Sequence, residues 1–171
     1  EVDMKVQIAI ENYNDLFSDF DIRSYSERYI SSDFLNELRM RTYKVLNRKG
    51  IEITLVIPEG ERDAEDERII IKRLHDFFQI RRDRNIKKRN GILLKSIFLE
   101  VVGIGCMFVA NFLSKYTIEY FKDFMLIPSW FFVGKWLEKY FDHRKILDKK
   151  IKYYSFISES RIRFESMQED R

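Results

Sequence analysis

The chain has 171 residues, with 31 Lys and Arg against 28 Asp and Glu, a formal net charge of +3 and one cysteine. This length suits one ordinary domain. The single cysteine excludes a disulfide framework and a zinc site built from several thiolates. Only nine of the charged residues fall among residues 92–141. The charge pattern therefore divides the chain into polar tails and an apolar middle.

The first 31 residues contain one predicted strand and one predicted loop. Apolar and polar residues alternate over residues 2–10, which is the period of a half-buried strand. Residues 11–31 have no sustained period and are rich in Asn, Asp and Ser, so we expect a long loop with short turns. Asp15, Asp19 and Asp21 lack the spacing and the glycine of an EF-hand loop, which favours a solvated turn over a calcium site.

A helix and a second strand are predicted next. Ser32 is a good N-cap for a helix over residues 33–49, and Gly50 lies at the usual position just past a helix end. Residues 51–57 alternate again and stop at Pro58, which predicts a strand. This part of the chain therefore continues as helix and strand.

The remaining polar segments predict two helices and a third strand. A helix over residues 64–80 places apolar residues on one face and continues into the basic segment that follows. A long amphipathic helix after Trp136 is expected to end near Ser158, and residues 161–164 alternate as a short strand. Because two strands make a poor sheet, we expect the C-terminal strand to complete it. The predicted fold class is α+β, a small cytoplasmic α/β sheet domain built from both tails with an inserted two-helix transmembrane hairpin.

The apolar middle of the chain predicts this membrane hairpin. Residues 96–114 carry a single charge, Glu100, and a helix with a rise of about 1.5 Å per residue gives them nearly the roughly 30 Å of bilayer hydrocarbon. Residues 124–134 are too short alone and could cross only by extending to residue 141, with two lysines reaching the headgroups. Two other arrangements stay open: two buried helices of a soluble α/β domain, or one span followed by an interfacial helix.

The charges beside the apolar stretches predict the orientation. Residues 81–90 hold six basic residues and one acidic residue, residues 142–152 hold five and two, and the connection 115–123 is neutral. The positive-inside rule then places both termini of a multi-pass protein in the cytoplasm. The expected organisation is an N-terminal cytoplasmic α/β portion (1–90), a transmembrane helical hairpin (92–141), and a C-terminal cytoplasmic helix and strand (142–171).

Two sets of candidate site residues follow from this topology. A charge near mid-membrane is costly, so Glu100 is a functional candidate unless Lys135, Ser129 or the headgroups satisfy it. Its neighbours at helical spacing are small or polar, which suits close helix packing or a cation-selective pore. The packing or pore-lining candidates are Ser96, Glu100, Gly103, Met107, Ala110 and Ser114. The candidates for lipid-headgroup contacts are Arg81, Arg82, Arg84, Lys87, Lys88, Arg89, Arg144 and Lys145.

No catalytic, cofactor or metal site is predicted. His75 and His143 have no partner at ligand spacing, so we expect surface roles, and Cys106 is expected to act as a small hydrophobe. The chain has no glycine-rich phosphate loop and no nucleophile elbow. The basic clusters flank apolar stretches, which favours anionic lipids over nucleic acid as partners. No signal peptide is expected in residues 1–30, because no positive start precedes an apolar run.

Three segments resemble a group of uncharacterised bacterial proteins with an N-terminal α/β region and two membrane helices. The segments read DLFSDFDIRSYSERYIS, ITLVIP and WFFVGKWLEKYF. Those proteins carry a more regular Gly-Trp and Trp-Pro pattern in the second helix, which Trp130, Gly134 and Trp136 match in part. The resemblance implies the two-helix topology and carries over no activity.

These features predict a small integral membrane protein that acts as a non-enzymatic anchor or assembly component. Its cytoplasmic α/β domain would bind a protein partner or other copies of the chain, and membrane lipids would be the other partner. One alternative is an oligomeric channel or membrane-disrupting effector gated by the cytoplasmic domain. Another is a small membrane-bound lipid-modifying enzyme, for which the chain offers no motif.

Overall fold

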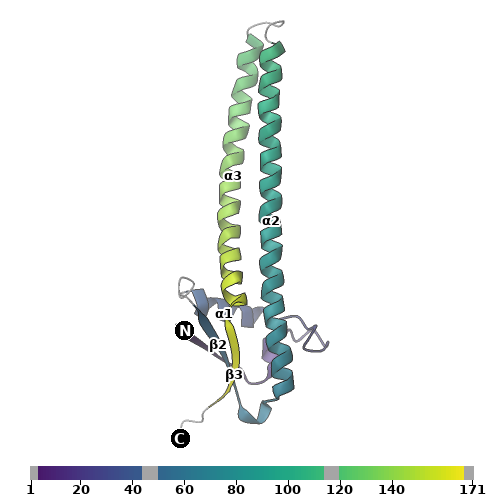
Figure 1. Ribbon diagram of the computed structural model, residues 1–171, viewed down its shortest axis with the longest axis vertical. Helices are drawn as coiled ribbons and strands as arrows, with labels where there is room; N and C mark the ends of the chain where they lie inside the picture. The colour runs from purple at the N-terminus through teal and green to yellow at the C-terminus, as the bar shows by residue number, and fades with distance from the viewer. Residues whose placement is uncertain (1–3, 44–49, 114–119, 168–171) are drawn as a thin grey trace. The chain divides into compact units, whose positions relative to one another are not determined.

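The computed structural model describes residues 4–43, 50–113 and 120–167 (Figure 1). At positions 99, 106, 107, 109–111, 113, 120–133, 135, 136 and 139 it describes the helical backbone but not the side chain. The elements in chain order are β1 (Met4–Ala9), the 3-10 helix η1 (Tyr13–Leu16), α1 (Ser32–Tyr43), β2 (Ile51–Ile57), the 3-10 helix η2 (Glu59–Glu61), α2 (Ala64–Leu113), α3 (Tyr120–Ser158) and β3 (Arg161–Ser166).

The chain divides into two compact units, which are described separately. The sheet unit consists of Glu1–Arg82 with Lys152–Arg171. The hairpin unit consists of Asp83–Ile151 and holds the greater part of α2 and α3.

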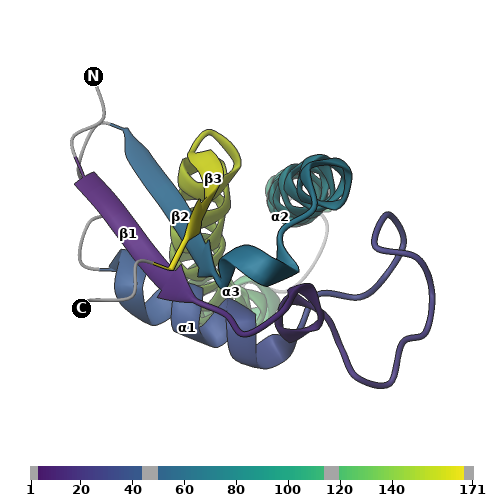
Figure 2. The same ribbon diagram turned by 90° about the horizontal axis from the view of Figure 1, so that it is seen from below.

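The sheet unit contains a three-stranded parallel sheet in the order β1-β2-β3 (Figure 2). The C-terminal strand β3 pairs with the central strand β2, so the prediction that the last strand completes the sheet is confirmed. The register sets Ile8 beside Leu55, and Leu55 beside Phe164. Because side chains alternate between faces along a strand, this register collects apolar residues on one face of the sheet.

The apolar face of the sheet shares one core with three helices. Residues four apart lie on the same side of a helix, and the buried residues of α1 and α2 follow this spacing. Burial of each such side chain contributes about 1.5–3 kcal/mol. The buried helical residues of the core are Phe34 and Leu38 on α1, Ile70, Leu74 and Phe78 on α2, and Ile157 on α3.

The opposite face of the sheet carries charged side chains. Lys5 on β1 and Glu165 on β3 form an ion pair across β2, with 2.7 Å between Nζ and Oε2. Thr54 on β2 is 0% exposed, and its hydroxyl has no hydrogen-bond partner among the described residues. Parallel strands are usually buried on both faces. β2 follows this rule, because it is buried on its apolar face and Thr54 is buried on the face that carries the charged side chains.

Two polar contacts of the sheet unit fix helix ends. The Asp63 carboxylate accepts hydrogen bonds from the backbone N–H groups of Glu65 and Asp66, at 2.8 and 3.0 Å, which caps α2 where the helix begins. His75 Nδ1 lies 3.1 Å from the carbonyl oxygen of Ser158, the last residue of α3. The expected surface role of His75 is therefore wrong, because the ring is half-buried against a helix end.

The predicted elements agree closely with the observed ones. β2 has the predicted bounds, α2 continues through the basic segment, and α3 ends at Ser158 as predicted. α1 begins at Ser32, and the predicted continuation over residues 44–49 lies outside the described residues. Gly50 has a φ of 81°, in the left-handed region that favours glycine, and its predicted place just past a helix end depends on residues outside the described ones.

The mixed α/β class is thus confirmed, with a three-stranded parallel sheet. In the part of the chain that the structure describes, no helix combines the length and the apolar composition needed to cross a membrane.

Candidate functional site

Apolar side chains of the hairpin unit are exposed to an unusual degree. Leu94 is 74% exposed, Phe98 68% and Phe108 73%, although exposure of such side chains to water is unfavourable. At about 100° per residue, the exposed apolar residues of α2 cover nearly half of the helix circumference. The exposed set is Leu94, Ile97, Phe98, Val101, Val102, Ile104, Phe108 and Phe112 on α2, with Leu137, Phe141 and Ile146 on α3.

The half-buried residues of α2 mark its contact side with α3, which lies alongside it in the hairpin (Figure 1). Asn85, Arg89, Ile92 and Ser96 are half-buried and follow each other at spacings of three and four, the spacing of one helix face. Arg89 contacts Asp148 on α3 directly. On α3, Leu147 is 6% exposed at the same seam. The two helices are therefore packed against each other near Arg89 and Leu147, whereas most of the exposed apolar residues lie farther along α2.

The packing or pore-lining candidates divide between the seam and the surface. Ser96 lies on the seam, and its hydroxyl donates a hydrogen bond to the Ile92 carbonyl at 2.7 Å. Glu100 and Gly103 continue the same spacing but are exposed, and no described atom lies within 4 Å of a Cβ built at Gly103. The other candidates lie outside the described side chains, as does Cys106: they are Met107, Ala110 and Ser114. Close packing along this stripe stays a prediction.

One carboxylate joins the two helices of the hairpin. Asp148 Oδ1 lies 3.2 Å from Arg89 Nη1, and Asp148 Oδ2 lies 3.6 Å from Arg144 Nε. Two guanidinium groups thus share one carboxylate, so this Arg89–Asp148–Arg144 triad carries one net positive charge. The side chains are 35%, 44% and 49% exposed in that order, so solvent reaches all three.

A narrow hollow lies beside the triad, between the helices. It is too narrow to enclose a small molecule. The surface inside it is apolar, so a charged group would meet the Arg89 and Arg144 guanidinium groups beside the hollow, where these side chains are 35% and 49% exposed. The lining residues are Arg89, Ile92, Tyr140, Arg144 and Leu147.

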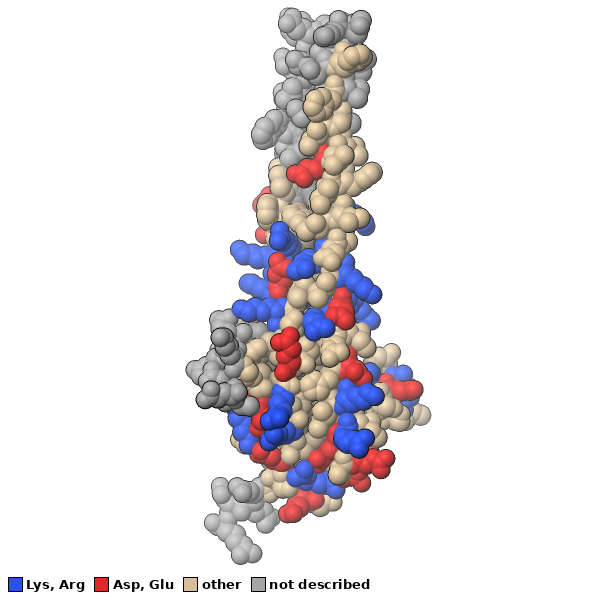
Figure 3. All heavy atoms as spheres, viewed as in Figure 1, with Lys and Arg blue, Asp and Glu red and all other residues tan. Residues whose placement is uncertain are grey.

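The remaining headgroup candidates do not converge on this hollow. Lys and Arg side chains gather around the hairpin where the apolar segment begins (Figure 3). Arg84, Lys87, Lys88 and Lys145 are exposed, and helical spacing distributes those of α2 around the helix. The Arg81 guanidinium lies 4.8 Å from the centre of the Phe77 ring. Arg82, the remaining candidate, is half-buried. Among the predicted headgroup residues, only Arg89 and Arg144 are brought together.

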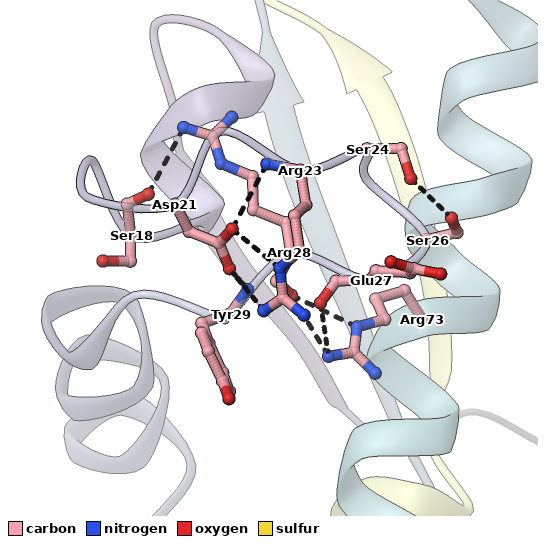
Figure 4. Close-up of polar contacts among 9 residues, drawn as sticks. All are labelled: Ser18, Asp21, Arg23, Ser24, Ser26, Glu27, Arg28, Tyr29 and Arg73. Carbon is pink, nitrogen blue, oxygen red and sulfur yellow. Dashed lines mark hydrogen bonds and ion pairs between the residues drawn. The ribbon is translucent and has the colours of Figure 1, made fainter.

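The sheet unit has a second polar site, formed by the loop between η1 and α1 (Figure 4). Asp21 accepts hydrogen bonds from the Arg23 guanidinium at 2.9 and 2.8 Å and from the Tyr29 backbone N–H at 2.8 Å. These bonds, above all those from Arg23, hold the pKa of the Asp21 carboxyl well below its usual range. The expected solvated turn is thus a pinned loop, and a pocket of about 360 Å³ beside it is lined by Arg23, Ser24, Tyr25, Ser26, Arg28, Asp66 and Ile69.

This loop pocket has little charge left for a ligand. The Arg23 charge is neutralised by Asp21, and Asp66 in the lining opposes an anion. The Arg73 guanidinium donates hydrogen bonds to the backbone carbonyl oxygens of Glu27, at 3.3 Å, and of Arg28, at 3.2 and 3.3 Å. The arginines around the pocket therefore act mainly to hold the loop.

Sequence reasoning placed Tyr140 among the aromatic residues at the proposed membrane boundary, but it missed Asp148 and the loop network. The spacing of Arg144 and Asp148, four apart on one helix, was the one local signal for the triad. Among the described residues, no group of three or more His, Cys, Asp or Glu side chains could hold a metal ion. Comparison of the chain with protein-family models, curated proteins and solved structures finds no match.

Proposed function

We propose that the chain is a non-enzymatic membrane component, in which residues 92–141 form a transmembrane hairpin and the sheet unit binds a partner or other copies in the cytoplasm. The observation that carries the proposal is the exposed apolar set of the hairpin unit. Contiguous apolar surface of this extent is rare on proteins surrounded by water and marks contact with lipid or protein.

Charge favours lipid as the main cover of this surface. Residues 96–114 hold one charged residue, whereas basic residues predominate immediately outside residues 92–141. Basic residues on both flanks are attracted to the anionic cytoplasmic leaflet and set a hairpin orientation. A protein partner alone would explain the apolar set but not the basic residues on both flanks.

The interaction role of the sheet unit follows from its surface. Phe20 and Ile22 are 99% and 98% exposed on the pinned loop, next to Asp21. A loop held by its own hydrogen bonds loses little entropy on binding, and exposed aromatic and aliphatic side chains are typical of binding surfaces. No catalytic arrangement accompanies this loop among the described residues, which supports binding over catalysis.

Membrane fractionation with an alkaline carbonate wash, followed by protease treatment from each side, tests this function. The chain is expected to stay with the membranes, and both tails should be cleaved only from the cytoplasmic side. A Val101→Arg, Phe108→Arg variant should leave the membrane fraction, because each charge in hydrocarbon is costly. Ile146→Arg is the matched control, since Ile146 is exposed but lies outside residues 92–141. Recovery of the unaltered chain in the wash contradicts the proposal.

An oligomeric channel is the second candidate function. Glu100 is exposed within the apolar segment, and the space at Gly103 would admit a close neighbour. Copies packed along this stripe would bring their Glu100 carboxylates together and favour cations. Conductance in planar bilayers that changes its ion selectivity in Glu100→Gln supports this function, and absence of conductance removes it.

A further inference from the structure

The hairpin offers one place where a single anionic group could be held by two cations. Each guanidinium of the triad has five N–H donors; Arg89 donates one to Asp148, and Arg144 forms an ion pair with Asp148 at 3.6 Å without a hydrogen bond. Neither Arg89 nor Arg144 has a second carboxylate partner among the described residues. The remaining donors and the net positive charge can bind a phosphate oxygen, for which guanidinium groups are well shaped.

The two arginines lie at equal depth below the apolar segment. Arg89 lies three residues before Ile92, and Arg144 lies three residues after Phe141. At about 1.5 Å per residue, each arginine lies about 4.5 Å outside residues 92–141 along its helix axis. In a hairpin that spans the membrane, this is the zone of the lipid phosphates. The triad therefore lies where an acyl chain meets its headgroup.

The lining of the hollow completes this match. Ile92 and Leu147 provide an apolar floor, and Tyr140 lies at the boundary position where interfacial aromatics are common. The hollow itself is too small to admit a ligand, so a ligand held by the two exposed guanidinium groups must be supported from outside the protein. A phospholipid has that support from the surrounding bilayer.

The geometry points to a binding site for the phosphate of one anionic phospholipid at the Arg89–Asp148–Arg144 triad. This inference rests on the proposed function and adds a particular ligand to it. The monoanionic headgroup balances the net charge of the triad and links α2 to α3 through both arginines. A zwitterionic lipid brings its own cation to a surface already rich in Lys and Arg, so it binds more weakly.

Titration of the detergent-solubilised full chain with short-chain phosphatidylglycerol, phosphatidylcholine and inorganic phosphate tests the site. Phosphatidylglycerol should bind most tightly, and Arg89→Gln, Arg144→Gln should weaken it at least about tenfold, as the loss of charge-assisted hydrogen bonds implies. Arg84→Gln, Lys145→Gln is the matched control, because it removes the same charge from the same helices outside the triad. It should change the affinity less than about twofold.

Two further variants separate binding from a purely structural role. Asp148→Asn leaves both guanidinium groups without their shared carboxylate, so anionic lipid should bind more tightly; a structural role of the triad predicts no gain. Arg89→Lys, Arg144→Lys keeps the charge and loses the planar fork, so it should retain part of the affinity and guards against misfolding of the Gln variant.

Equal losses in the triad variant and its control would overturn the inference in favour of a diffuse basic surface. Inorganic phosphate that binds as tightly as phosphatidylglycerol would overturn the lipid assignment. Both results are compatible with retention of the chain in membranes after the carbonate wash. Failure of this inference is thereby distinguishable from failure of the proposed function.

Discussion

Apolar side chains are used in opposite ways by the sheet unit and the hairpin unit. In the sheet unit, the leucine and the three isoleucines of β2 are at most 3% exposed and lie in one core with α1, α2 and β3. In the hairpin unit, Leu94, Phe98 and Phe108 are each more than two-thirds exposed. A core that includes the first and last strands covers its own apolar side chains, whereas these side chains of the hairpin have no such cover among the described residues. The sheet unit thus covers its own apolar side chains, and the hairpin unit is the part that we propose as the anchor.

Removal of the C-terminal strand should have the largest effect on this comparison. A chain ending at Ser158 loses Ile162 and Phe164, which are 6% and 8% exposed, and leaves β2 without one neighbour. We expect the sheet unit to unfold, because two strands make a marginal sheet. A chain ending at Met167 keeps β3 and is the control. Protease resistance of residues 4–82 measures the outcome, and equal resistance of the two truncated chains would disprove a shared core.

A pair of Leu→Ala variants tests burial directly. Leu55→Ala in β2 should lower the free energy of unfolding of the sheet unit by about 2–5 kcal/mol, because Leu55 is 0% exposed and leaves a cavity. Leu94→Ala, at a site that is 74% exposed, should leave it nearly unchanged. Hydrogen exchange of the β2 amides under denaturant reports both. Equal effects of the two substitutions would contradict the contrast between the units.

The polar face of the sheet allows a smaller prediction. Thr54→Val should raise the free energy of unfolding by about 1 kcal/mol, because it removes a buried hydroxyl without a partner and keeps the shape. Thr42→Val is the matched control, since the Thr42 hydroxyl donates to the Leu38 carbonyl at 2.6 Å and its loss should destabilise by a similar amount. Thermal unfolding measures both, and shifts of the same sign would contradict the prediction.

The pinned loop should respond to acid with the smallest effect. The pKa of the Asp21 carboxyl is lower in the folded chain than in the unfolded chain. The ionised carboxylate therefore stabilises the fold fully at pH values above the ordinary pKa of Asp, and this stabilisation is lost as the pH falls through the pKa of the folded chain. The Tyr29 amide donates to Asp21, so its protection, which is its exchange rate compared with that of an unstructured amide at the same pH, should decrease as the pH falls well below about 4. Asp21→Asn should remove this pH dependence, and Asp19→Asn, at an exposed carboxyl, should keep it. Protection that is independent of pH in the unaltered chain would refute the role of Asp21.

Local patterns in the sequence were sufficient to predict the strands and most helix ends. The bounds of β2 follow from strict alternation and from Pro58, and the end of α3 follows from the decay of its apolar period. The contact of His75 with Ser158 was not predictable, because it joins residues far apart in sequence through packing of α2 near the end of α3. The Asp21 network was missed although it is local, because turn conformation decides which groups a carboxylate meets.

The candidate site was predicted in composition but not in geometry. The basic flanks and the apolar segment were identified from counts of residues, which require no knowledge of packing. The pairing of Arg89 with Asp148 depends on the register of α2 against α3. The residues at the contact between the two helices set this register, and the hydrophobic period of each helix does not specify which residues of the other helix they contact. Only the structure selects two arginines from the eight basic candidates.

Reagent accessibility of two exposed phenylalanines tests the central claim most directly. In a Cys106→Ser background, single cysteines replace Phe98 of the hairpin, 68% exposed, or Phe20 of the pinned loop, 99% exposed, and the chains are placed in membranes. Phe98→Cys should react with a lipid-soluble maleimide and resist a charged one, whereas Phe20→Cys should react readily with the charged reagent. Rapid reaction of both positions with the charged reagent would contradict the assignment of the hairpin to lipid.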